Sequence, residues 1–353
     1  MAKQANKMNF ILKRMFLTIY IFSIFLFSYA DGISQDIKKV GTSAATFLRI
    51  PVGSRGTAMG SAFASVASDV TAMFWNPGGL AKVSNYSLLV DHSPWLPGLD
   101  FNYFGLALPF GRWGIVGMNI TSLTTEQMEI TTPQDPMGTG ETFTASSMAV
   151  GLCYARYLTD RFSIGANVKY IHESIYHCSA SGFAFDIGTL YITPFDDIRL
   201  GVSVSNVGTK MQMTGEDLNV NVDIAPQQEG NNQSVVGRLK TEKFDLPIIM
   251  RVGLSWDAWQ TKGSCFTIAA DAINPNDNAL SVNIGVEYAL INQMLILRGG
   301  YNELFLAFRE KGLALGAGLN FILKNDLGIT MDYAYQDFIH LGGVNRISLA
   351  IYF

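Results

Sequence analysis

The sequence is poor in the residues that build metal centres, disulfide frameworks and charged surfaces. It contains 3 cysteines and 4 histidines in 353 residues, and only 15% of its residues are charged. Cys153, Cys178 and Cys265 are far apart and odd in number, which argues against a zinc or disulfide spacing. His92 and the other histidines show no metal-ligand spacing. We therefore expect no metal and no cofactor.

Long apolar runs are also missing after residue 30, although 48% of the residues are hydrophobic and the mean hydropathy is +0.20. No later run approaches the roughly twenty residues that a spanning helix needs. A closed β-barrel is the other structure that satisfies every backbone group in lipid. The composition therefore favours a membrane barrel over a water-soluble domain.

The first thirty residues have the pattern of a secretory signal peptide. Four basic residues between Lys3 and Arg14 precede an apolar run over 15–27, and small residues around Ala30 predict cleavage after it. A membrane-anchoring helix is the alternative, but the run is too short. Beyond Ala30 the chain holds 21 basic and 29 acidic residues, so nucleic acid is not an expected partner.

Apolar residues from Leu246 onward fall on every second position, which predicts β-strands. Met250, Val252 and Leu254, for example, alternate with Arg251 and Gly253. Alternation alone fits a soluble sandwich as well as a membrane barrel. The polar face decides between them, because it is rich in Gly, Ala, Ser and Asn, which suit a crowded barrel interior, and poor in the Lys and Glu of a soluble surface.

We predict an all-β fold, a transmembrane antiparallel barrel of about fourteen strands. The strands are expected to begin near Tyr86, Phe101, Gly114, Phe143, Phe162, Gly182, Ile198, Leu246, Phe266, Leu280, Met294, Gly312, Leu327 and Val344. Short links should alternate with longer ones, as periplasmic turns alternate with external loops, except at the short link 176–179. The chain ends in Phe353, as outer-membrane barrels commonly do.

Charged residues on the predicted inner face carry both signs in similar numbers. They are Lys169, Asp186, Arg199, Arg251, Asp271, Glu287, Arg298 and Asp332. We interpret them as an internal network that holds and fills the barrel. A selectivity lining for an aqueous pore is the alternative, but it would favour a cluster of one sign. No nucleophile motif occurs, so we do not expect an enzyme, although a triad assembled from distant strands would leave no local motif.

The segment 41–83 is rich in Ala, Ser and Gly and predicts short helices and tight turns before the first strand. It resembles the PorV/PorQ family of FadL-like outer-membrane proteins. The resemblance rests on Phe47-Leu48, Gly53-Ser54-Arg55, Met59-Gly60, Ala62-Phe63, Asp69 and Trp75-Asn76-Pro77-Gly78-Gly79-Leu80, and continues through His92-Ser93-Pro94-Trp95-Leu96. The family usually has alanine where this chain has Gly78.

The resemblance implies a hatch tucked into a fourteen-stranded barrel, with Arg49 and Arg55 available to lumen carboxylates. It divides the chain into a signal peptide (1–30), a hatch (31–83) and a barrel (84–353). The hatch either acts only as a plug that completes folding and closes the pore, or has a direct ligand role. The implied location is the bacterial outer membrane, with its lipid as a partner.

Three functions remain open. The resemblance implies association with type IX protein secretion, in which the chain would bind a translocon subunit and the C-terminal domains of cargo, with the long external segment 210–245 as a docking site. The alternative is FadL-like transport of hydrophobic small molecules, which predicts an apolar pocket involving Phe47, Phe63, Phe74 and Trp75. A purely structural role is the third.

Overall fold

The computed structural model describes residues 41–227, 234–306, 309–323 and 327–353. The predicted signal peptide and its cleavage after Ala30 lie outside the described residues. None of the helices in the described part of the chain has the length and apolar character needed to cross a membrane.

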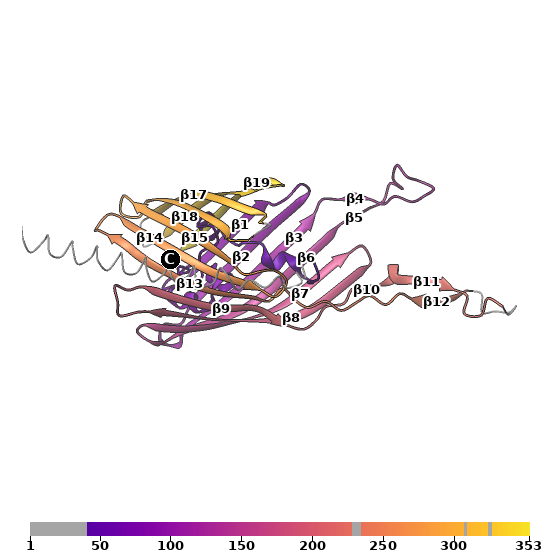
Figure 1. The fold of residues 1–353 in the computed structure, drawn as a ribbon, viewed down its shortest axis with the longest axis horizontal. Helices are drawn as coiled ribbons and strands as arrows, with labels where there is room; N and C mark the ends of the chain where they lie inside the picture. The colour runs from indigo at the N-terminus through magenta and orange to yellow at the C-terminus, as the bar shows by residue number, and fades with distance from the viewer. Residues whose placement is uncertain (1–40, 228–233, 307–308, 324–326) are drawn as a thin grey trace, which may run out of the picture. The chain divides into compact units, whose positions relative to one another are not determined.

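Fourteen antiparallel strands form a closed barrel, which confirms the predicted fold class (Figure 1). They follow one another around the ring in chain order, and β19 pairs with β1 to close it. The strands are β1 (Ser87–Pro94), β2 (Leu99–Pro109), β3 (Ile115–Thr125), β6 (Ala145–Thr159), β7 (Phe162–Ile175), β8 (Cys178–Ile192), β9 (Arg199–Gly208), β13 (Ile249–Gln260), β14 (Cys265–Pro275), β15 (Ser281–Leu290), β16 (Leu295–Leu304), β17 (Lys311–Ile322), β18 (Gly328–Phe338) and β19 (Gly342–Tyr352). Each begins within four residues of its predicted start.

The alternation in the sequence becomes an inner and an outer face of the wall. On β13, Arg251, Gly253 and Ser255 are buried inside, while Met250 and Leu254 are exposed on the outside. Successive strand residues point to opposite faces, so the same split recurs around the barrel. Apolar side chains on the outer face of a closed barrel form a surface that suits lipid.

The links between strands lie at two ends of the barrel, which we call the turn end and the loop end. The turn end holds the first residue of β1 and the last of β19, and its links are short. At the loop end only two connections are long, residues 126–144 and 209–248. The prediction that nearly every link at this end is longer was therefore wrong, because the strands there extend further than the alternation indicated.

The two long connections carry short strands of their own. Strands β4 (Met128–Glu129) and β5 (Thr142–Phe143) pair in the first connection. The second holds β10 (Thr214–Gly215), which extends the sheet beside β8, a 3-10 turn η4 (Glu216–Leu218), and the paired β11 (Asn219–Val222) and β12 (Val235–Arg238). The β11–β12 ribbon forms a separate two-stranded sheet, away from the barrel wall (Figure 1).

The segment before β1 lies inside the barrel and fills much of it. We use the word hatch for its described part, residues 41–83, which contains η1 (Thr46–Arg49), α2 (Ser54–Ala58), α3 (Ala72–Trp75) and η2 (Pro77–Lys82). Ala44 hydrogen-bonds to Asp245 in the loop-end connection, whereas Gly78 lies against the turn-end halves of β7 and β8. The hatch therefore runs from the loop end to the turn end, where β1 begins.

Candidate functional site

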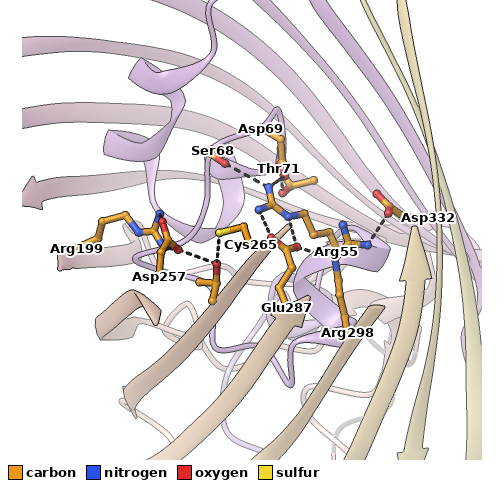
Figure 2. A network of polar contacts seen from close by, with 11 residues as sticks. Arg55, Ser68, Asp69, Thr71, Arg199, Asp257, Cys265, Glu287, Arg298 and Asp332 are labelled. Carbon is orange, nitrogen blue, oxygen red and sulfur yellow. Dashed lines mark hydrogen bonds and ion pairs between the residues drawn. The ribbon is translucent and has the colours of Figure 1, made fainter. Parts of the chain in front are cut away.

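A network of buried and half-buried charges joins the hatch to the wall (Figure 2). Arg55 of α2 contacts both carboxylate oxygens of Glu287 on β15 at 2.9 Å, and its Nη1 contacts Asp69 at 3.1 Å. Arg298 on β16 contacts Glu287 at 2.7 Å and Asp332 on β18 at 2.5 Å. Two arginines and three carboxylates thus alternate across the hatch and three strands. Such paired geometry offsets the cost of removing the charges from water.

Two further wall carboxylates accept hydrogen bonds from the hatch backbone. Asp271 on β14 accepts from the amides of Phe63 and Ala64 at 2.8 and 2.7 Å. Asp91 on β1 accepts from the Gly53 amide at 3.2 Å, and is also bound by Arg346 and Ser348 of β19. Backbone amides left unpaired by an irregular segment are costly when buried, so these carboxylates hold the hatch in place.

The Asn76-Pro77-Gly78 turn packs against the inner side of β8. The Asn76 side chain donates to the carbonyls of Ala64 and Thr189 and accepts from the Gly78 amide, which begins η2. A Cβ on Gly78 would lie 2.8 Å from the Gly188 carbonyl oxygen of the wall. The PorV/PorQ family usually has alanine at this position, and an alanine here would require the turn to shift. The glycine therefore sets how closely the hatch approaches β8.

The neighbouring residues of the hatch motif also have defined places. Trp75 donates from Nε1 to the Val52 carbonyl at 2.9 Å, while its own carbonyl accepts from Ser203 of β9. Met59 and Gly60 lie against the backbone of Gly285 and Gly300 in the wall. Pro77, Gly79 and Leu80 are buried in η2. The motif is thus a set of packing contacts between hatch and wall.

At the loop end, the start of the hatch is anchored to the connection between β14 and β15. Arg49 contacts Asp277 at 2.9 Å, and Ser43 donates to the same carboxylate oxygen at 2.9 Å. Asp277 was not among the charged residues singled out from the sequence. It follows a strand, where alternation no longer indicates which way a side chain points.

The inner-face prediction placed eight charged residues in the lumen, and the structure places all eight on the inner side of the wall. Lys169 pairs with Asp186 at 2.9 Å, and Arg199 binds Asp257 through two bonds of 2.7 and 3.1 Å near the turn end. Glu287, Arg298 and Asp332 form the network of Figure 2. Arg251 and Asp271 differ, because neither forms an ion pair with any residue that the structure describes.

The sequence analysis missed the most buried ion pair of the described residues. Asp91 and Arg346 are 0% and 1% exposed and lie 2.6 Å apart across the β1–β19 seam. Both occupy inner-face positions of their strands, and that alternation was the available signal. The sequence did not indicate that these two residues pair, because they lie on the first and last strands of the chain.

The wall between β8 and β9 is irregular. The register shifts between Phe185 and Ile187, opposite Asn206, whose φ of 65° is in the left-handed region. Asp186 holds this bulge by accepting from the Asn206 amide at 2.7 Å. A bulge of this kind bends the strand and increases its twist.

An apolar groove lies beside this bulge on the outer face. We call it the wall groove; its volume is about 300 Å³, and it is lined by Phe185, Ile187, Gly188, Thr189, Val202, Ser203, Val204 and Val207. Its floor includes Gly188, and a Cβ there would overlap the Asn76 side chain of the hatch. The hatch turn and the wall groove are therefore separated by little more than one layer of backbone.

The pocket predicted between Phe47, Phe63, Phe74 and Trp75 is present only in part. Phe47 and Phe63 are fully packed in the hatch core. Phe74 and Trp75 line a small cavity at the loop end, together with Arg251. That cavity is as much polar as apolar, unlike the wall groove.

Comparisons with known proteins identify the fold. A scan of protein-family models and a search of curated protein sequences found no match. Among solved structures, a Pseudomonas aeruginosa FadL homologue aligns with 86% of this chain and 98% of its own, at 13% identity and a TM-score of 0.50. The toluene transporters TodX of Pseudomonas putida and TbuX of Ralstonia pickettii both align with 85% of this chain and 97% of theirs, at 12% and 13% identity and TM-scores of 0.52.

The fold is therefore that of FadL-like outer-membrane barrels. At these identities the likeness concerns the fold alone. The closer resemblance to the PorV/PorQ family is not shown by these comparisons.

Proposed function

We propose that the protein moves hydrophobic small molecules across a bacterial outer membrane. The barrels of similar fold include two toluene transporters and a FadL homologue. This similarity of fold favours the transport hypothesis over the hypothesis of type IX protein secretion. The observation that carries the proposal is the apolar wall groove beside the bulge between β8 and β9.

The wall groove has the features of a place where an apolar molecule enters or leaves the barrel. Phe185, Ile187 and Val207 are about half exposed on the outer face, where lipid would lie. The inner side of the same wall segment contacts the hatch, through Gly188 at Asn76 and Ser203 at Trp75. A path from the groove to the barrel interior would require β8 and β9 to part at the bulge between Phe185 and Ile187, together with a shift of the hatch turn behind them.

The test is uptake of radiolabelled toluene and of a long-chain fatty acid by cells that lack their own barrel of this type. Val204→Phe fills the wall groove, whereas Val286→Phe makes the same change at an outward position of β15, away from the groove. We expect uptake with the wild type and with Val286→Phe, and reduced uptake with Val204→Phe. If cells that carry the wild-type protein take up neither compound faster than cells without it, the transport proposal fails.

A second candidate function, protein docking at the cell surface, is favoured by the loop-end ribbon β11–β12. Val222, Val235 and Val236 are exposed on this ribbon, and Ile224 follows it. A two-stranded ribbon is marginally stable alone, so a partner that covers these residues would stabilise it. Deletion of residues 219–238 should abolish co-purification of a secretion translocon subunit or of cargo proteins if this function is real. Uptake of hydrophobic molecules should be unaffected by the deletion.

A further inference from the structure

The bulge between β8 and β9 interrupts the hydrogen-bond ladder of the wall. Asp186 of β8 faces two residues of β9 there, Ser205 and Asn206, because the register shifts. The extra residue of a bulge is left unpaired by the neighbouring strand. The backbone amide of Asn206 donates to the Asp186 carboxylate at 2.7 Å. A side chain therefore supplies the connection between the two strands at this point.

The Asp186 carboxylate binds two further groups, both on β7. Its Oδ1 contacts the Lys169 ammonium at 2.9 Å, and its Oδ2 accepts from the side-chain amide of Asn167 at 3.2 Å. Asp186, Asn167 and Asn206 are only 1%, 1% and 2% exposed. Hydrogen bonds to a charged group are the stronger class, and a buried network makes them stronger still. The carboxylate thus ties β7, β8 and β9 together.

The side chain of Asn206 is also bound at both of its polar atoms. Its Oδ1 accepts from the Lys169 ammonium, and its Nδ2 donates at 2.9 Å to the carbonyl of Pro247, just before β13. These contacts hold Asn206 in the left-handed region of backbone conformation, which asparagine adopts more readily than most residues. The bulge is therefore a defined structure and not a place where the pairing is loose.

This polar cluster and the wall groove occupy opposite faces of the same segment of β8. Phe185 and Ile187, which flank Asp186 in the chain, line the groove and are 54% and 56% exposed on the outer face. The cluster lies on the inner face, where Asn167 also donates to the Met73 carbonyl of the hatch at 3.4 Å. A path from the groove to the barrel interior would therefore have to pass the Asp186 carboxylate.

We propose that the Asp186 carboxylate is a latch that holds the wall closed behind the wall groove. While it binds the Asn206 amide, β8 and β9 stay joined across the bulge. When its bonds are lost, the strands part there, because the backbone ladder is already interrupted at this point. That the resulting gap passes hydrophobic molecules rests on the proposed function, whereas the latch itself does not.

The experiment measures whether a probe in the membrane can reach the inner face behind the bulge. The full-length barrel, without its native cysteines, is placed in lipid vesicles with a maleimide on a long alkyl chain. Ser205→Cys reports at the bulge, and Thr121→Cys reports at an inner-face position of β3, away from the groove. Ser205 and Thr121 are 3% and 4% exposed, so both cysteines should label slowly in the otherwise unchanged barrel.

Asp186→Asn tests the latch at constant size. Asparagine offers one acceptor oxygen in place of two and carries no charge for Lys169. Labelling of Ser205→Cys should become roughly 10-fold or more faster, since the closed wall loses a bond to a charged group, while labelling of Thr121→Cys should stay unchanged. Unchanged labelling at Ser205→Cys, or an equal rise at Thr121→Cys, would overturn the proposal.

Folding of each variant is checked by the gel mobility of the unheated barrel. If Asp186→Asn does not fold, Lys169→Met takes its place. It leaves Asp186 its two amide donors, so labelling of Ser205→Cys should rise by a smaller factor. No rise at this position in folded Lys169→Met would then overturn the latch.

Uptake of radiolabelled toluene by cells separates the latch from the proposed function. Faster uptake with Asp186→Asn than with the wild type is expected if the parted strands form the path. Faster labelling of Ser205→Cys without any uptake would support the latch and refute transport. Uptake by the wild type with unchanged labelling in Asp186→Asn would support transport and refute the latch.

Discussion

Arg298 and Arg55 share the carboxylate of Glu287, but their removal leaves different groups unpaired. Without Arg55, Glu287 keeps Arg298, and Asp69 is exposed enough to be solvated. Without Arg298, Asp332 loses the one ion pair that the described residues give it. We therefore expect Arg298→Met to cost about 3–5 kcal/mol, as breaking a buried pair does, and Arg55→Met to cost about 1–2 kcal/mol.

The measurement is the urea dependence of unfolding of both variants in the same detergent. Lys169 of β7, which is paired with Asp186 of β8, offers a control for a buried pair outside this network. A larger loss for Arg55→Met than for Arg298→Met would show that the hatch contact, and not the wall pair, dominates.

Lys82, in η2 of the hatch, should titrate near physiological pH. Burial, followed by repulsion from Arg199 and Arg55, lowers the pKa of its amine to about 8. The folded state disfavours the charged form of this amine. The free energy of unfolding should therefore rise as the pH increases from about 8 towards the ordinary lysine pKa of about 10.4. Acylation of the Lys82 peptide, followed by mass spectrometry, should therefore have its midpoint near pH 8. The acylation with a midpoint near pH 8 should be absent from the Lys82→Arg variant. A midpoint near pH 10 for Lys82 in the wild type would refute the prediction.

At the level of elements, alternation located the strands because each inner position is buried and each outer position meets lipid. Ser281 to Leu290 on β15 repeats this pattern without interruption. The bulge at Asn206 was not predictable, because it depends on Asp186 of the neighbouring strand. The hatch elements are too short for a helical period to appear, and only the family resemblance, above all that of the Trp75-Asn76-Pro77 motif, indicated a hatch.

The register of β18 can be tested with two adjacent positions. Met331 is 50% exposed on the outer face, whereas Asp332 is 9% exposed on the inner face. In a background without the native cysteines, a thiol reagent confined to the membrane should label Met331→Cys and not Asp332→Cys. Equal labelling from the membrane and from water at both positions would contradict the assigned strand.

For the whole molecule, the hatch should govern whether the lumen conducts ions. It is tied to the wall by side-chain contacts, whereas each wall strand is paired along its length with two neighbours. Elements held by fewer cooperative contacts open first under denaturant. In planar bilayers we expect low conductance that rises reversibly in urea, at concentrations at which the barrel still migrates as folded on a gel. High conductance without urea would show that the hatch does not close the lumen.

The pairing of β1 with β19 also sets the order in which the molecule can be made. Ser87 meets Tyr352, so the seam joins residues that are among the last to find each other during folding. The hatch precedes β1 in the chain, and its backbone contacts the inner side of β7, β8 and β15. A completed ring is open only at its two ends, whereas the hatch contacts the wall from the loop end to the turn end. We therefore expect the seam to close around a hatch that is already in position, with Asp91–Arg346 as the ion pair that joins β1 to β19.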